Sequence, residues 1–63
     1  MGYNYGDLVQ ARADGKHFSD FNREQQAQIC EDYYKVKTGA TADYAGTEAS
    51  LAPFIEDMRT GAF

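Results

Sequence analysis

The sequence predicts a small all-α protein: a helical hairpin of two main helices, over about residues 20–37 and 51–60, with an irregular N-terminal segment. Three observations carry this prediction. Residues 23–37 contain neither Gly nor Pro, apolar side chains recur at helical spacing in both stretches, and a Gly follows each of them. With 63 residues, the chain is expected to be a single small domain or a fragment of one, residues 1–63.

The N-terminal segment, residues 1–16, is rich in Gly and polar side chains. Residues 7–12 suit a short helical turn that ends before Gly15. We expect this segment to be ordered only where it lies on the two main helices. Its bulky anchors are few: Tyr3, Tyr5, Leu8 and Val9.

The first main helix is expected to begin at a cap formed by Ser19 or Asp20. Neither residue is followed three positions later by Glu or Gln, so no capping box is expected there. The end of this helix is better defined, because Lys35 and Lys37 suit the negative end of the helix dipole and Gly39 is a natural terminator.

The two faces of this helix differ in polarity. At about 100° per residue, Ile29, Tyr33 and Val36 share an apolar face, flanked by Ala27, Cys30 and Tyr34. The opposite face is expected to hold the polar residues Glu24, Gln28, Glu31 and Lys35, with Glu31 and Lys35 as an i,i+4 ion pair.

The second main helix follows a loop of small residues, 39–47, in which Tyr44 is the expected anchor. Pro53 decides where this helix begins. It fits the first turn if Ser50 is the cap, whereas it would clash inside a helix begun at Glu48. Gly61 is expected to end the helix, whose buried stripe at i, i+3, i+4 and i+7 is Leu51, Phe54, Ile55 and Met58. The loop is long enough for the two helices to pack antiparallel.

Composition excludes several classes of function. Ten acidic and six basic residues give a net charge of −4, which argues against nucleic-acid or acidic-membrane partners because both require clustered Lys and Arg. There is no apolar run near about 18 residues and no signal sequence, so no membrane span is expected. One Cys and one His make neither an internal disulfide nor a metal site, and a lone thiol suits a reducing compartment.

The ionisable residues suggest no complete catalytic group. Glu31 and Asp32 are adjacent, so they are expected to diverge by about 100° and not to form an acid–base dyad. Cys30 lies on the apolar face as an inert buried thiol, and His17 suits an exposed loop, so no thiol–imidazole pair is expected. The tyrosines have two readings: a mixed aromatic core, or a surface that covers a protein partner.

The segment Asn22-Arg-Glu-Gln-Gln-Ala-Gln-Ile-Cys-Glu-Asp-Tyr-Tyr34 resembles the Asn-x-Glu-Gln-Gln-Ala-x-Ile-x-x-Asp-Tyr stretch of zincin-like metallopeptidase domains. These domains are associated with bacterial Rhs-type, type VI secretion and contractile-injection toxins. The resemblance extends weakly to Tyr3-Asn-Tyr5 and to Leu51-Ala-Pro-Phe-Ile55 with Arg59. It implies that a His-Glu-x-x-His helix precedes this region and that Glu24 is a third zinc ligand. This sequence contains no His-Glu-x-x-His, so alone it is expected to hold no catalytic zinc and to hydrolyse nothing.

Two functions follow as expectations. The resemblance implies the helical C-terminal part of a zinc-metallopeptidase-like bacterial effector domain, inactive alone, whose partner is the remainder of that domain. Zinc would then be a cofactor of the complete domain only, in the bacterial cytoplasm or exported with the effector. The alternative is a free-standing acidic helical protein-binding module, such as an adaptor, an immunity-like protein or a phage accessory protein.

Overall fold

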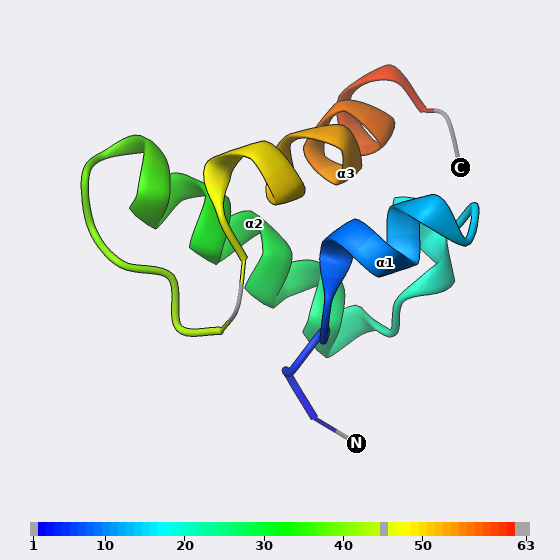
Figure 1. The fold of residues 1–63 in the computed structure, drawn as a ribbon, viewed down its shortest axis with the longest axis horizontal. Coiled ribbons are helices and arrows are strands. Elements are labelled where there is room, and N and C mark those ends of the chain that lie inside the picture. Colours follow the sequence, from blue (N-terminus) through cyan, green and yellow to red (C-terminus); the bar gives the residue numbers. More distant parts are fainter. Residues whose placement is uncertain (1, 45, 62–63) are drawn as a thin grey trace.

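The structure is a computed structural model that describes residues 2–44 and 46–61, and the described residues form helices and no strands (Figure 1). In chain order these are α1 (Leu8–Ala13), the 3-10 turn η1 (Phe18–Asp20), α2 (Arg23–Lys37) and α3 (Glu48–Thr60). The predicted all-α fold is confirmed, with two main helices and an irregular N-terminal segment.

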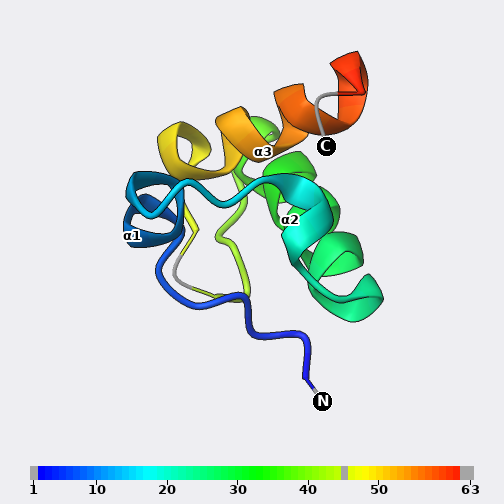
Figure 2. The same ribbon diagram turned by 90° about the vertical axis from the view of Figure 1, so that its right-hand side faces the viewer.

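Helix α3 is the element on which the others pack. It lies across both α1 and α2 and also contacts η1, so the core is enclosed between them (Figures 1 and 2). Ile29 and Phe54, the predicted centres of the core, are fully buried. Each such side chain contributes about 1.5–3 kcal/mol through burial. The core comprises Tyr5, Leu8, Ala11, Phe18, Phe21, Ile29, Leu51, Phe54 and Ile55.

Helix α2 begins later than predicted. Asn22 is its cap, in a capping box with Gln25: the Gln25 amide donates to the Asn22 side chain at 2.7 Å and the Asn22 amide donates to the Gln25 side chain at 2.9 Å. The predicted caps, Ser19 and Asp20, lie in η1 instead. The reason is that Phe21 and Asn22 both have an extended backbone, with ψ 155° and 171°, which separates η1 from α2 while Phe18 and Phe21 are buried.

The end of α2 agrees with the prediction. Thr38 is the C-cap, and Gly39 follows it with φ 92°, a left-handed conformation that favours Gly. The Ala40 amide donates to the Lys35 carbonyl at 2.7 Å and closes the last turn. The Lys35 ammonium lies 3.1 Å from the Glu31 carboxylate, which confirms the predicted i,i+4 pair.

Helix α3 begins earlier than predicted, at Glu48 instead of Leu51, and Pro53 lies inside it. Thr47 is the cap and Ser50 is its capping-box partner: the Thr47 amide donates to the Ser50 hydroxyl at 2.8 Å and the Ser50 amide donates back at 3.2 Å. Pro53 removes one intrahelical amide donor, an effect that costs about 3 kcal/mol in a helix interior. The capping box and the complete burial of Leu51 and Phe54 on either side of the proline offset this cost.

The apolar faces are narrower than predicted. Tyr33, Val36 and Cys30 pack partly buried against the core, but Tyr34 is 70% exposed and Met58 is 39% exposed. Tyr34 follows Ile29 by five residues, which places it about 140° round the helix from the core. At the N-terminus, Tyr5 and Leu8 are buried as expected, whereas Tyr3 and Val9 are exposed; the short helical turn expected over residues 7–12 is α1.

Candidate functional site

Two buried aspartates organise the interior, and both are absent from the predicted set of buried residues. Asp32 is fully buried and Asp57 is 4% exposed. Each follows a fully buried apolar residue by three positions, Asp32 after Ile29 and Asp57 after Phe54. Three residues turn a helix by about 300°, so each carboxylate lies only about 60° from the centre of its buried face.

Asp32 joins three segments that are distant in sequence. The Tyr5 hydroxyl donates to one carboxylate oxygen, while the Gln28 side chain donates to the other at 2.7 Å and the Asp43 amide at 3.2 Å. The Tyr5 hydroxyl also accepts a hydrogen bond from the Gly46 amide at 3.2 Å, and the Tyr5 ring meets the Tyr44 ring edge-on. Burial, reinforced by the hydrogen bond to Asp32, raises the pKa of Tyr5. The N-terminal segment and the 39–47 loop are therefore held on α2 through one carboxylate.

The same carboxylate belongs to an acidic cluster with Glu31 and Asp43, in which one oxygen of each residue lies within 4.8 Å of the others. Glu31 is exposed and Asp32 is fully buried, in agreement with the expected divergence, and Asp43 of the following loop brings its carboxylate close to both. The Lys35 ammonium lies 2.8 Å from Asp43 and bridges it to Glu31. Its hydrogen bond holds the pKa of Asp43 below the usual range. A cation at this cluster would have to displace the Lys35 ammonium.

Gln28 was expected on the polar surface but is 8% exposed. It is buried because its side-chain amide donates to Asp32 at 2.7 Å and to Asp43 at 3.1 Å. The cluster thus supplies its own donors, and no buried side-chain polar atom of the described residues lacks a hydrogen-bond partner. This arrangement fixes the 39–47 loop.

Asp57 forms the second junction. The Arg12 guanidinium donates to both of its oxygens, at 2.6 and 3.2 Å, and lies over the Phe54 ring at 5.3 Å from its centroid. The His17 Nδ1 atom and the Phe18 amide each lie 3.3 Å from Asp57 Oδ2. The bond from Arg12 holds the pKa of Asp57 well below its usual range. Asp57 therefore ties α1 and η1 to α3.

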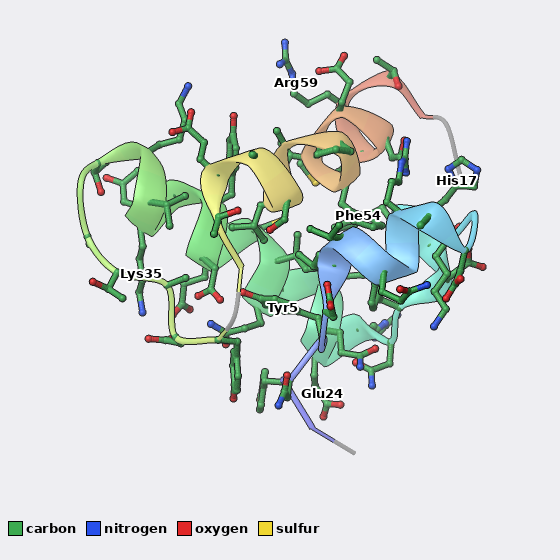
Figure 3. All side chains as sticks on the ribbon, viewed as in Figure 1. Tyr5, His17, Glu24, Lys35, Phe54 and Arg59 are labelled. Atoms are coloured by element: carbon green, nitrogen blue, oxygen red, sulfur yellow. The ribbon has the colours of Figure 1, made fainter. Side chains whose placement is uncertain are left out.

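The residues predicted to carry chemistry are not brought together. Glu24 lies half-buried in the first turn of α2, at a different edge of the molecule from His17 (Figure 3). Among the described residues, no ion pair involves Glu24, and the cluster close enough to share a cation does not include it. Its role as a zinc ligand stays a prediction.

Cys30 and His17 have separate surroundings. The Cys30 thiol is partly buried and lies 3.6 Å from the Met58 sulfur, and burial raises the pKa of the thiol. The exposed His17 ring contacts Asp57 instead. This matches the expectation that these two side chains form no catalytic pair.

One side of the molecule exposes apolar groups in a continuous stripe. Ala27, Cys30 and Tyr34 follow one another along α2 at i, i+3 and i+7, and Met58 of α3 contacts Cys30. We call these four residues the Tyr34 face. Elsewhere, no pocket opens on the described part of the chain, and none of its helices is long and apolar enough to cross a membrane.

Comparisons of this chain with protein-family models, with curated proteins and with solved structures find no match. They neither support nor oppose the resemblance to zincin-like domains. The function is therefore argued from the geometry of the chain.

Proposed function

We propose that this chain is a small acidic helical protein-binding module whose contact surface is the Tyr34 face. One observation carries the proposal: Tyr34 is 70% exposed on a well-capped helix, one turn after Cys30, whose sulfur contacts the 39% exposed Met58. Tyrosine and methionine are enriched where protein interfaces bury surface, and an aromatic ring on a rigid helix loses little entropy on binding.

The rest of the molecule supports a binding role more than a chemical one. The buried carboxylates Asp32 and Asp57 are each satisfied by donors of the chain itself, and the described residues line no pocket that would take a small substrate. Enzymes and small-ligand proteins place their polar groups in concave sites. A protein surface is recognised instead by exposed anchors, and Tyr34 is the most exposed large hydrophobic side chain of those described.

A site-specific cross-linking experiment tests the proposal. Tyr34 is replaced by the photoreactive p-benzoylphenylalanine, and the variant is expressed and irradiated in the organism that encodes the chain. Val9 is the matched control, because it is 68% exposed but lies on α1. We expect discrete conjugates from position 34 that are absent from position 9. Identical patterns from the two positions, or no conjugate from position 34, would refute the assignment.

The second candidate is the helical C-terminal part of a zinc-metallopeptidase-like effector domain. What favours it is that the segment carrying the resemblance is one capped helix, with Glu24 half-exposed in its first turn and in no ion pair with a described residue. The gene provides the test: a His-Glu-x-x-His within about a hundred residues upstream would supply the missing ligands. In such a longer product, Glu24→Gln is expected to weaken stoichiometric zinc binding, measured by calorimetry. Unchanged zinc affinity would exclude Glu24 as a ligand.

A further inference from the structure

We infer that the Tyr34 face binds a second copy of this chain, through antiparallel packing of α2 on α2 about a two-fold axis at Tyr34. This inference rests on the proposed function, because it names the partner of the same face. Closed two-fold pairs are the commonest protein oligomers, and they require one surface patch that is complementary to itself. The Tyr34 face meets that requirement in its shape and in its charges.

The shape follows from helical geometry. Ala27, Cys30 and Thr38 all lie within about 40° of Tyr34 round the helix. Cys30, one turn before Tyr34, is partly buried and Thr38, one turn after it, is exposed, so a small side chain lies on each side of the large ring along the helix; Ala27, a further turn away, is also exposed. With Tyr34 on the axis, its ring lies against the partner's Tyr34 and is flanked by the partner's Cys30 and Thr38. Aromatic pairs of this kind stabilise beyond their buried area.

The charges favour the antiparallel direction. Glu31 precedes Tyr34 by three residues and Lys37 follows it by three. In an antiparallel pair centred on Tyr34, Glu31 therefore lies at the same height along the helix axis as the partner's Lys37. The two-fold symmetry gives a second, equivalent Lys37–Glu31 pair. A parallel arrangement would instead set Glu31 level with the partner's Glu31. The Glu31 side chain is 56% exposed, although it pairs with Lys35 of its own helix, and the Lys37 ammonium lies 5.7 Å from the Tyr33 ring centroid in contact with no carboxylate among the described residues.

The small surface of the chain limits the expected strength of the dimer. The accessible surface of the chain is 3969 Å², so a standard interface of about 800 Å² per partner would take about a fifth of it. Met58, against Cys30, extends the apolar area beyond α2. Two copies of net charge −4 repel one another. We therefore expect a reversible dimer in the micromolar to millimolar range.

Sedimentation equilibrium over that concentration range tests the inference. The mass is expected to rise from 7.0 kDa toward twice that value. Tyr34→Ala should weaken dimerisation by about tenfold or more, because Tyr is a frequent hot spot at the centre of an interface. Val9→Ala removes a similarly exposed side chain from α1 and should leave the equilibrium unchanged. Circular dichroism confirms that both variants are folded.

A charge exchange tests the direction of packing. Glu31→Lys and Lys37→Glu should each weaken the homodimer, because each variant sets like charges level with one another. Mixing the two variants should restore association, since every level pair in the mixed dimer is again opposite in charge. Failure of the mixture to associate more strongly than either variant alone would overturn the antiparallel arrangement.

A cysteine trap tests the two-fold axis. In a Cys30→Ala background, Tyr34→Cys should accumulate on oxidation as a disulfide-linked dimer, because a residue on the axis lies nearest its own copy and oxidation traps pairs that form even when loss of the ring weakens association. Val9→Cys in the same background should not. A wild-type chain that stays monomeric at millimolar concentration would overturn the inference, as would a dimer unaffected by Tyr34→Ala. Neither result bears on cross-links from position 34 to other proteins, which decide the proposed function separately.

Discussion

Replacement of Asp57 by Asn should show how much of the stability depends on the junction between α1, η1 and α3. The change keeps the size of the side chain but removes its charge and one of its two acceptor oxygens. Four contacts are affected: two hydrogen bonds from Arg12, at 2.6 and 3.2 Å, and the contacts of His17 and Phe18 at 3.3 Å. Hydrogen bonds to a charged group contribute about 1.5–3 kcal/mol.

The exposure of Arg12 moderates this cost. Breaking a fully buried ion pair costs about 3–5 kcal/mol because a charge is left without solvent or partner. Here the Arg12 side chain is 37% exposed and can regain water, whereas the Asp57 side chain is 6% exposed. We therefore expect Asp57→Asn to lower the free energy of unfolding by about 2–3 kcal/mol. For a domain of this size, that corresponds to a fall in Tm of roughly 10–20 °C.

Thermal and urea unfolding followed by circular dichroism measure this effect. Glu56→Gln is the matched control, because it removes the same charge from the adjacent position of α3. Its partner Arg59 is 3.5 Å away and both side chains are well exposed, so the change should stay below about 0.5 kcal/mol. If Asp57→Asn costs no more than Glu56→Gln, the junction does not stabilise the fold. A double-mutant cycle with Arg12→Met measures the coupling free energy between Asp57 and Arg12 directly.

Three further predictions concern acid, packing and the exposed carboxylate. The folded pKa of Asp57 lies below its unfolded value of about 3.9. The stabilisation by the Asp57 carboxylate is therefore complete above that pH and is lost as pH falls through the folded pKa. In urea unfolding at a series of decreasing pH values, the difference in stability between the wild type and Asp57→Asn should shrink. Gly46→Ala should cost about 1–3 kcal/mol in the same assay, because a Cβ there would lie 2.5 Å from the Tyr5 hydroxyl, and a loss near zero would contradict this packing. Ile29→Asp should abolish the thermal transition, because it buries an unpaired charge. Glu24→Gln on the same helix should leave Tm nearly unchanged. A large fall in the Tm of Glu24→Gln would mean that the fold needs the Glu24 carboxylate.

Local rules predicted much of this fold. The apolar stripes around Ile29 and Phe54, the glycine ends of α2 and α3 and the Glu31–Lys35 pair all depend on residues within a few positions of each other. The helix starts were predicted less well. The predicted start of α2 is wrong because Phe21 and Asn22 adopt an extended backbone where Phe18 and Phe21 pack into the core, and this places the cap at Asn22.

The buried carboxylates could not be predicted from local pattern, because their partners lie far along the chain. Tyr5 is 27 residues from Asp32, and Arg12 is 45 residues from Asp57. A weaker signal was present: each aspartate lies three residues after the centre of an apolar stripe, on the flank of the buried face. The predicted packing of Tyr34 on the core is wrong for the opposite reason: Tyr34 is close to the apolar stripe in sequence but lies about 140° round the helix from Ile29 and is exposed.

The position of α3 also bears on how the chain folds as it is synthesised. α1 and α2 are synthesised before α3, the helix against which both of them pack. Until α3 is available, Ile29 and Leu8 have no partner surface from it, and isolated helices of this length are marginal in water. The core can therefore close only once Phe54 is available to it, so α1 and α2 are not expected to form stably before α3.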